Sequence, residues 1–206
     1  MSTFIIAEAG VNHNGSLDLA KRLIDVAAEA GADAVKFQTF NAEQLVARHA
    51  PKAEYQTRTT DAGESQFDMI RKLELTANDH EVLIAHAKTR RIEFLSTPFD
   101  SPSLALLTQR LGLTTIKISS GDITNAPFLL ESARVAKRLI LSTGMSTLGE
   151  IESALGVLAF GFVVPGSTPQ RNSFEDAFSS DAGQRALLDR VTLLHCTTEY
   201  PAPFTE

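Results

Sequence analysis

The stretch FIIAEAG at residues 4–10, followed by SLDLAKRLIDVAAEAG at 16–31 and AVKFQT at 34–39, decides the fold class of this sequence. Two short apolar runs enclose a segment of helical periodicity, in which Ser16 is placed to cap the helix and Gly31 to end it. The strand-like runs that follow are IEFLSTPF (92–99), TTIKISSG (114–121), RLILSTG (138–144) and VTLLHCT (191–197). Six strands alternating with helices predict a parallel sheet covered by helices, either doubly wound or closed into a barrel.

Two segments interrupt this alternation, residues 40–75 after the second strand-like run and residues 161–186 before the sixth. Each is much longer than the ~2–6 residues that usually connect strands and helices. The second begins with GFVVPGSTPQRNS, which is rich in Ser, Pro and Gly. We therefore predict that residues 40–75 leave the sheet and that residues 161–186 form an insertion or mobile loop.

Composition limits the class of protein. The chain has 206 residues, 43% of them apolar and 21% charged, which predicts one globular domain with a sizeable core. A net charge of −6 without a basic cluster argues against nucleic acid as a partner. No run approaches the ~18 apolar residues that span a bilayer, so no membrane partner is expected. With Cys196 as its one cysteine the chain forms no internal disulfide, and we expect a cytoplasmic protein.

Polar residues gather where the strand-like runs end. Lys36 and Gln38 alternate on AVKFQT and therefore share one face of that strand. The carboxyl ends of parallel strands meet at one edge, where α/β folds place their binding sites. We expect Lys36 and Lys117 to point into one cavity and hold an anionic ligand, because buried ammonium groups need negative partners. The candidate residues at these ends are Glu8, Lys36, Gln38, Thr97, Lys117, Ser120, Asp122, Ser142, Thr198 and Tyr200.

Each candidate also has a purely structural alternative. A lysine within a strand can lie at a sheet edge with its ammonium group in water, and Glu8 can be a core carboxylate with its own partners. The serine and threonine hydroxyls can cap the helices that follow the strands. Capping and phosphate binding are compatible, however, because both use the donors at a helix start.

The histidines and the cysteine predict neither a metal site nor a nucleophile. His13, within VNHNGS, fits a turn after the first strand. His195 and Cys196 are adjacent in a strand, so their side chains point to opposite faces and cannot form a dyad. No His or Cys spacing typical of a metal site occurs. The remaining histidines are expected at the surface: His49, His80 and His86.

Six motifs in register resemble the barrel domain of the sialic acid synthase family, which includes N-acetylneuraminate, legionaminic acid and pseudaminic acid synthases. They are IIAEAGVNHNGSL (5–17), AGADAVKFQTF (30–40), FLSTPFD (94–100), IKISSGDITNAPFLL (116–130), LSTGMSTLGEI (141–151) and LLHCTTEYPAP (193–203). Each motif alone is modest evidence. Their common order along essentially the whole chain makes the resemblance specific.

The resemblance implies an α/β TIM (β/α)8 barrel, of which residues 1–206 hold the first six strands. A barrel of this kind takes about 250 residues, so the chain is expected to be truncated. The resemblance further implies an antifreeze-like (SAF) C-terminal domain, absent here, and a domain-swapped homodimer of the full-length parent. It implies a divalent metal, Mn²⁺ or Mg²⁺, whose histidine ligands lie beyond residue 206, with no metal ligand in this chain. The fragment by itself is therefore expected to be inactive.

The implied reaction joins phosphoenolpyruvate to an N-acylated amino sugar and releases phosphate. By motif position, Glu8 and Asp122 are the acid–base or orienting carboxylates, and Gln38 and Tyr200 face the sugar. The residues around phosphoenolpyruvate would be Lys36, Thr97, Lys117, Ser120, Ser142 and Thr198.

Two departures from the sialic acid branch affect the expected sugar. Asp122 stands where that branch usually has Glu, and Thr198 where it usually has Asn. Together with the CTTEYPAP motif (196–203), they favour a 2,4-diacetamido-trideoxyhexose over N-acetylmannosamine. Two other readings stay open: another phosphoenolpyruvate-using 3-deoxy sugar acid synthase, and a non-catalytic flavodoxin-like ligand-binding domain. The second is disfavoured because no Gly-rich phosphate fingerprint occurs at the first strand–helix turn.

Overall fold

A computed structural model of the chain describes residues 3–47 and 65–197, which fall into two compact units, Met1–Leu107 and Thr108–Glu206. Each unit is built around its own three-stranded parallel sheet and its own buried core. The α/β class with parallel strands is therefore confirmed. Each group of three strands has its own covering helices, and the expectation of one globular domain stays a prediction. Within the described ranges, no helix is long and apolar enough to cross a membrane.

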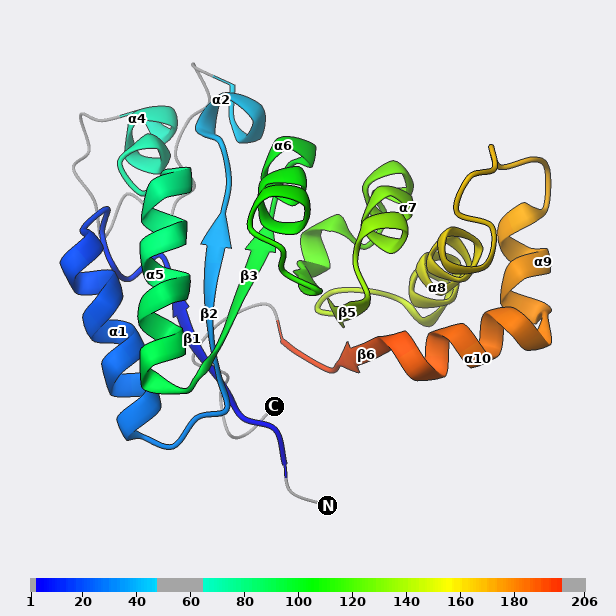
Figure 1. Ribbon diagram of the computed structural model, residues 1–206. Helices are drawn as coiled ribbons and strands as arrows, with labels where there is room; N and C mark the ends of the chain where they lie inside the picture. The colour runs from blue at the N-terminus through cyan, green and yellow to red at the C-terminus, as the bar shows by residue number, and fades with distance from the viewer. Residues whose placement is uncertain (1–2, 48–64, 198–206) are drawn as a thin grey trace. The chain divides into compact units, whose positions relative to one another are not determined.

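The first unit has the strand order β1–β2–β3, the same as the order along the chain (Figure 1). A flavodoxin-like sheet would place its first strand between the second and third, so this order argues against that alternative. The elements of this unit are β1 (Ile6–Gly10), α1 (Leu17–Glu29), β2 (Ala34–Thr39), α2 (Ala42–Leu45), α4 (Gln66–Arg71), α5 (Ala77–Arg90), β3 (Glu93–Pro98) and α6 (Ser101–Ala105).

The helix signals at Ser16 and Gly31 act as the sequence indicates. The Ser16 hydroxyl accepts a hydrogen bond from the Leu19 amide at the start of α1, and Gly31 follows the helix with a left-handed φ of +78°. Helix α5 begins at a capping box, in which Thr76 and Asp79 satisfy each other's backbone N–H groups. These caps fix where both helices begin, and Gly31 ends α1 before β2.

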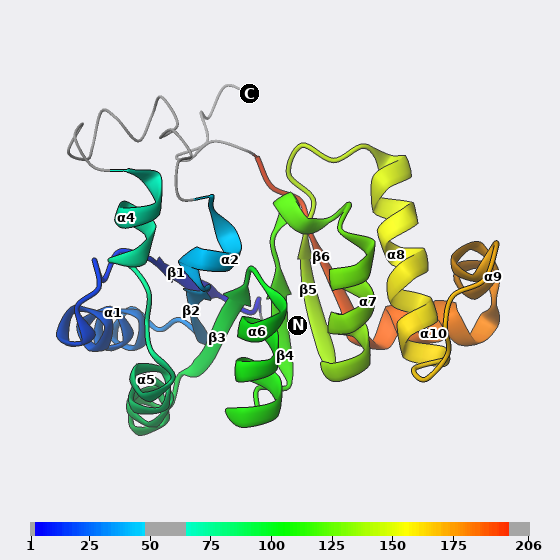
Figure 2. The same cartoon turned by 90° about the horizontal axis from the view of Figure 1, so that it is seen from above.

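The core of the first unit lies between its sheet and helices α1 and α5 (Figure 2). Phe37 of β2 and Phe94 of β3 stack with ring centroids 5.3 Å apart, and Ile24 of α1 and Leu83 of α5 are fully buried. Burying aliphatic side chains of this size contributes roughly 1.5–3 kcal/mol each. This apolar layer buries the face of β2 that carries Phe37 against the helices, so the polar residues of β2 lie on its other face.

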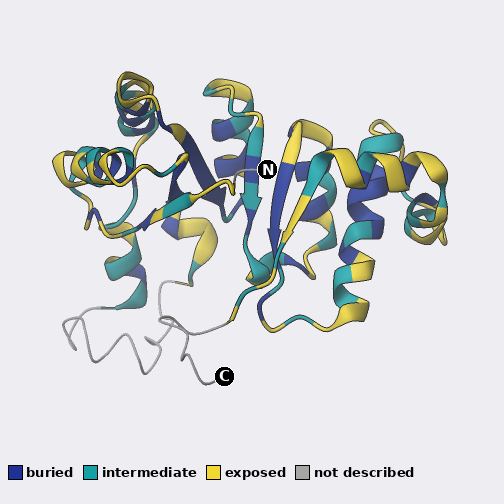
Figure 3. Cartoon of the chain, turned by 90° about the horizontal axis from the view of Figure 1, so that it is seen from below, coloured by how far each residue is buried: buried dark blue, intermediate teal, exposed yellow. Residues whose placement is uncertain are grey.

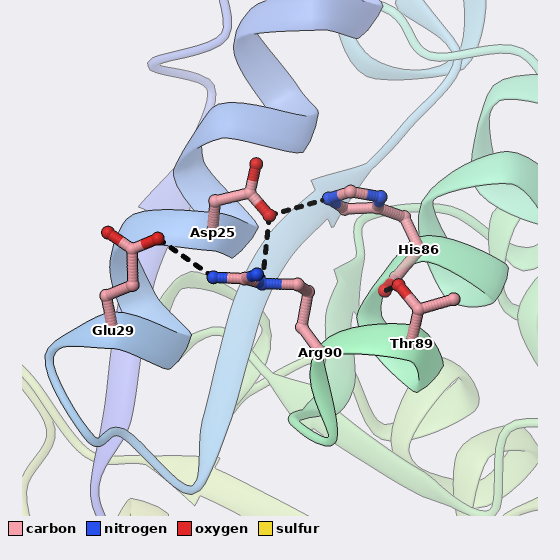
Figure 4. Close-up of polar contacts among 5 residues, drawn as sticks. All are labelled: Asp25, Glu29, His86, Thr89 and Arg90. Atoms are coloured by element: carbon pink, nitrogen blue, oxygen red, sulfur yellow. Dashed lines mark hydrogen bonds and ion pairs between the residues drawn. The ribbon is translucent and has the colours of Figure 1, made fainter.

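A cluster of ion pairs joins α1 to α5 on the outer surface (Figure 4). Asp25 Oδ1 lies 2.8 Å from His86 Nε2 and 3.1 Å from Arg90 Nε, while Glu29 Oε1 lies 2.9 Å from Arg90 Nη2. All four side chains are partly solvent-exposed. Exposed pairs contribute only ~0–1 kcal/mol each, so the apolar layer beneath them holds the helices together.

The second unit has the strand order β4–β5–β6. Its buried side chains include Ile116 and Ile118 of β4 and Leu139 and Leu141 of β5, whereas β6 is more exposed (Figure 3). Helix α8 packs against α7, α9 and α10. The elements are β4 (Thr115–Ile118), the 3₁₀ turn η2 (Ser120–Asp122), α7 (Ala126–Val135), β5 (Arg138–Ser142), α8 (Leu148–Val163), α9 (Ser173–Ser179), α10 (Asp181–Arg190) and β6 (Val191–Leu194); a π-helical turn η1 (Leu106–Arg110) precedes them.

The prediction of a loop over residues 161–186 is wrong, because the end of α8, α9 and the first part of α10 occupy most of it. Phe174 packs edge-on against Phe160 of α8 at 5.6 Å, and its carbonyl approaches Gly156 closely. Tertiary packing onto α8 thus overrides a local composition that favours a loop. Whether the segment is an insertion stays a prediction. Residues 40–75 contain α2 and α4, and residues 48–64 lie outside the described part of the chain.

Candidate functional site

One face of the first sheet carries four of the predicted site residues. In register, Glu8 of β1 lies opposite Lys36 of β2, and Gln38 lies opposite Thr97 of β3. Because Lys36 and Gln38 are two residues apart, all four side chains point to the same side of the sheet, away from the Phe37 core. The structure therefore brings Glu8, Lys36, Gln38 and Thr97 together, as the sequence predicts.

Lys36 is a buried cation with a carboxylate partner. Its side chain is 9% exposed and its Nζ forms an ion pair with Glu8 Oε2, whereas the Glu8 side chain is 54% exposed. Leu95 lies on the other side of Lys36 in the sheet and is itself buried. Such an ammonium group keeps its charge only where an anion lies close to it. The Glu8 carboxylate supplies that charge here, and an anionic ligand would offer a second one.

Thr97 has a buried hydroxyl whose hydrogen-bonding capacity is not used. The residue is 2% exposed, and its Oγ1 atom has no hydrogen-bond partner within the described residues. Buried polar atoms without partners are uncommon, and they mark places where water or a ligand binds. Thr97 is thus placed to donate to a ligand at the same edge as Lys36.

A β-bulge at the end of β1 shapes this edge. The register shifts between Glu8 and Gly10, where Gly10 adopts a left-handed φ of +52°. A Cβ atom on Gly10 would lie 3.3 Å from Glu8 Oε1 and 3.9 Å from Gln38 Nε2. The bulge therefore places a residue without a side chain between the carboxylate and the amide, and the sequence analysis did not identify it.

Two histidines lie on the opposite, helix-covered face, and the expected surface position of His80 is wrong. His80 is fully buried: its Nδ1 donates to the Thr76 carbonyl at 2.9 Å, and its Nε2 lies 2.8 Å from Thr39 Oγ1. Thr39 Oγ1 in turn lies 2.7 Å from Ser96 Oγ. Only helix packing shows this, since His80 belongs to the apolar side of α5. The network joins the carboxyl ends of β2 and β3.

His13 forms part of the β1–α1 loop, in agreement with its predicted turn role. It is fully buried, its Nδ1 accepts from the Gly15 amide at 3.0 Å, and its Nε2 has no partner within the described residues. Burial, with a smaller contribution from the nearby His80, lowers the pKa of His13 below its ordinary value. Burial likewise lowers the pKa of His80, against the hydrogen bond to the Thr76 carbonyl. Both rings are therefore held neutral in the folded protein.

In the second unit, Lys117 and Ser142 share one face of the sheet. Lys117 of β4 lies opposite Ile140 of β5, and Ser142 follows Ile140 by two residues. Ser142 is buried, and Lys117 is half-buried. At the end of β4 the chain turns through η2, which carries Ser120 and Asp122. The second unit thus gathers its four described candidates at the carboxyl ends of β4 and β5.

Asp122 has an altered acidity. Burial raises the pKa of its carboxyl group, and this effect outweighs the hydrogen bond from Asn125 and the positive charge of Lys117, both of which lower it. A carboxyl group of this kind holds a proton more readily at neutral pH than an exposed aspartate does. It is placed to exchange a proton next to a cationic side chain.

The remaining predicted residues divide into two groups. Thr198 and Tyr200 lie outside the described residues. His195 is exposed, whereas the half-buried Cys196 has its Sγ 3.3 Å from the Leu194 carbonyl, so nothing pairs the two. Among the described residues, no group of three or more His, Cys, Asp or Glu side chains could hold a metal ion. This part of the chain therefore does not fit a metal site.

Comparison with known proteins identifies the family of this chain. The model of the NeuB family matches residues 23–206. The chain is 52% identical to N,N'-diacetyllegionaminic acid synthase of Campylobacter jejuni over 99% of its own length and 54% of that protein. It is 43% identical to the Legionella pneumophila protein of the same name, over 100% of the chain and 52% of the relative. The chain thus spans about half the length of these curated relatives.

A solved structure agrees with the sequence comparison. The N-acetylneuraminic acid (sialic acid) synthetase of Leptospira borgpetersenii serovar Hardjo-bovis, determined in complex with citrate, superposes with a TM-score of 0.72 at 31% identity. The match covers 100% of this chain and 57% of that structure. The family match, the sequence identities and the likeness in fold agree, and the chain belongs to the NeuB family.

Proposed function

We propose that the full-length protein is a nonulosonic acid synthase, a transferase that condenses phosphoenolpyruvate with an N-acylated amino sugar and releases phosphate, and that this chain carries phosphoenolpyruvate-binding residues. The observation that carries the proposal is the polar face of the first sheet. There, a buried lysine lies on the same sheet face as a buried hydroxyl near the carboxyl end of β3, and that hydroxyl has no partner among the described residues. The names of the relatives support the same reaction class.

The reaction needs two bonds to form and one to break. C3 of phosphoenolpyruvate bonds to the aldehyde carbon of the open-chain sugar, water adds at C2, and the C2–O bond to phosphate breaks. The oxygen of water becomes the new C2 carbonyl, and its two protons end on the aldehyde oxygen and on the released phosphate, so the step requires groups that bind anions and groups that exchange protons.

The residues of this chain supply both kinds of group. Lys36 and Lys117 bind the anionic groups of phosphoenolpyruvate, with hydroxyl donors from Thr97, Ser120, Ser142 and, in the proposal, Thr198. Asp122 donates the proton to the aldehyde oxygen, which its raised pKa favours. Glu8 orients Lys36 through their ion pair. Gln38 and Tyr200 are the proposed sugar contacts.

The proposal extends to the architecture. Parallel strands in sequential order, with helices between them, support the first six strands of a TIM barrel. The divalent Mn²⁺ or Mg²⁺ that the resemblance implies is assigned no residue of this chain and no step, because the described residues do not fit one. The SAF domain and the domain-swapped dimer belong to the proposal for the full-length protein.

The favoured sugar is a 2,4-diacetamido-trideoxyhexose. Asp122 and the expected contact Thr198 motivate this choice, and the relatives from Campylobacter jejuni and Legionella pneumophila are named for the matching product. Phosphate release by the full-length protein, measured with this sugar and with N-acetylmannosamine in parallel, tests it. Exclusive use of N-acetylmannosamine would refute the choice of sugar, and no phosphate release with either sugar would refute the proposed function.

The assignment of Lys117 is tested by kinetics. Replacing Lys117 with Met in the full-length protein removes a charged hydrogen-bond donor, which we expect to raise the KM for phosphoenolpyruvate about 10- to 100-fold. Lys137→Met is the matched control, because Lys137 is an exposed lysine of the same unit just before β5. A Lys117→Met enzyme with the wild-type KM would remove Lys117 from the site.

A further inference from the structure

Three buried polar side chains form one line of hydrogen bonds between helix α5 and the first sheet. His80 Nε2 lies 2.8 Å from Thr39 Oγ1, and Thr39 Oγ1 lies 2.7 Å from Ser96 Oγ. All three side chains are buried. We call this set, His80, Thr39 and Ser96, the buried hydroxyl network.

The direction of each hydrogen bond in the network follows from its partners. The Thr76 carbonyl can only accept, so the Nδ1 atom of His80, 2.9 Å away, carries a proton. Burial lowers the pKa of His80, so the ring is neutral and its Nε2 atom is an acceptor. The Thr39 hydroxyl therefore donates to Nε2, and the Ser96 hydroxyl donates to Thr39 Oγ1. His80 is the acceptor that gives both hydroxyls one orientation.

The His80 ring is fixed both to α5 and to the sheet. The backbone amide and the Nδ1 atom of His80 donate to the carbonyl of Thr76, the N-cap residue of α5, at 3.0 Å and 2.9 Å. The ring also meets Phe94 of β3 edge-on, with ring centroids 6.4 Å apart. The position of Nε2 is therefore set by contacts that do not involve the two hydroxyls.

The network ends beside two residues of the candidate site. Gln38 is the residue before Thr39 in β2. Thr97 is the residue after Ser96 in β3, and it lies opposite Gln38 in register. Consecutive strand residues point to opposite faces, so the network and this pair lie on two sides of the same two strands. The Thr97 hydroxyl has no partner within the described residues, so its position depends on the backbone next to Ser96.

The contact between the two hydroxyls joins the strands diagonally. In register, Ser96 lies opposite Phe37, and Thr39 lies opposite Pro98. The hydroxyl contact therefore spans two positions of the ladder, and it adds to the hydrogen bond from the Phe99 amide to the Thr39 carbonyl at 3.1 Å, where β2 ends. Loss of the Thr39 hydroxyl would remove the diagonal contact and the contact with α5 together.

We propose that His80 is a positioning residue of this site: its ring, through the two hydroxyls, holds the ends of β2 and β3 so that Gln38 and Thr97 keep their places on the opposite face. This inference rests on the proposed function for the substrates that these two residues bind. Because His80 acts through the strands, its replacement should weaken substrate binding without removing a substrate contact.

The first experiment replaces Thr39 in the full-length protein. Thr39→Val keeps the shape of the side chain but removes the hydroxyl, whereas Thr39→Ser keeps it. We expect Thr39→Val to raise the KM for phosphoenolpyruvate and for the amino sugar about 3- to 10-fold, which corresponds to one hydrogen bond. Thr39→Ser should leave both KM values close to those of the wild type. Wild-type KM values in Thr39→Val, or equal rises in the two variants, would overturn the proposal.

The split between KM and kcat separates positioning from a loss of stability. A smaller folded fraction lowers kcat and leaves KM unchanged, whereas displaced contacts raise KM. Leu83→Val is the matched control, because Leu83 is fully buried on the same helix as His80 and has no polar group. It should lower the melting temperature and leave both KM values unchanged. A rise in KM equal to that of Thr39→Val would contradict the proposal.

A second pair of variants changes the ring itself. Gln can place an acceptor near the position of His80 Nε2, whereas the shorter Asn reaches only to the position of Nδ1. We expect His80→Asn to raise both KM values about 3- to 10-fold and His80→Gln to raise them less. Equal KM values in the two variants would show that Nε2 does not position the site.

Hydrogen exchange tests the positioning without any substrate. Mass spectrometry follows exchange in peptides that contain the ends of β2 and β3, where Thr39→Val should speed exchange about 10-fold and Thr39→Ser should not. Unchanged exchange in Thr39→Val would overturn the proposal. If Thr39→Val fails to fold, Ser96→Ala takes its place in both measurements, because it removes only the last donor. If the wild-type protein releases no phosphate from phosphoenolpyruvate while Thr39→Val exchanges faster, the proposed function fails and the role of His80 in holding the strand ends stands.

Discussion

Removing either partner of the Lys36–Glu8 pair should affect stability very differently. Glu8→Gln leaves the ammonium group of Lys36, whose side chain is 9% exposed, without its counter-charge. Lys36→Met leaves a carboxylate that is 54% exposed and can be hydrated, while Met fills the space of the aliphatic stem. The uncompensated charge is thus buried in one variant and solvated in the other.

The magnitudes follow from this asymmetry. Losing one partner of a buried pair costs about 3–5 kcal/mol, whereas an exposed pair contributes about 0–1 kcal/mol. Because Glu8 is half-exposed and Gln still accepts a hydrogen bond, we expect Glu8→Gln to lower the free energy of unfolding by about 1–2 kcal/mol. Lys36→Met should stay within about 1 kcal/mol of wild type, since replacing a buried charge with an apolar group of similar volume is often neutral.

Urea unfolding of both variants at pH 7, with unchanged m-values, measures the difference. Glu29→Gln is the matched control, because its partner Arg90 is partly exposed and the loss should be below about 1 kcal/mol. A Lys36→Met protein that loses more stability than Glu8→Gln would refute the reasoning. It would mean that Lys36 stabilises the fold through contacts other than this pair.

Two further predictions concern the β1–α1 region. Because burial lowers the pKa of His13 and of His80, the unfolded chain takes up protons below pH ~6.5 that the folded one resists. The free energy of unfolding should be constant above that pH and fall below it by up to ~2.7 kcal/mol per pH unit for the two rings. Urea unfolding at pH 7.5, 6.5 and 5.5 measures this, and a flat profile would contradict it. Gly15→Ala adds a Cβ 2.2 Å from the Lys72 carbonyl oxygen at a φ of +76°, whereas Gly31→Ala at +78° meets nothing within 4 Å. Gly31→Ala should cost about 1–2 kcal/mol and Gly15→Ala clearly more; equal shifts of the melting temperature would contradict this.

The sequence alone was enough for the features that depend on neighbours along the chain. Alternation over two residues placed Lys36 and Gln38 on one strand face, and the helix caps at Ser16 and Gly31 are where the sequence places them. Parallel strands followed from the same alternation of strands and helices. These features are local, so periodicity and capping chemistry determine them.

Only tertiary structure decided what depends on contacts between distant residues. His80 is buried because its position on α5 turns it toward Thr39 and Ser96, and residues 173–190 are mostly helical because they pack onto α8. The Glu8–Lys36 pair depends on the register of β1 with β2. Gly144 needs its small size because the ends of three strands meet around it, which no pattern within one strand contains. Strand register and helix packing depend on contacts between residues that are distant in the sequence, so local sequence does not determine them.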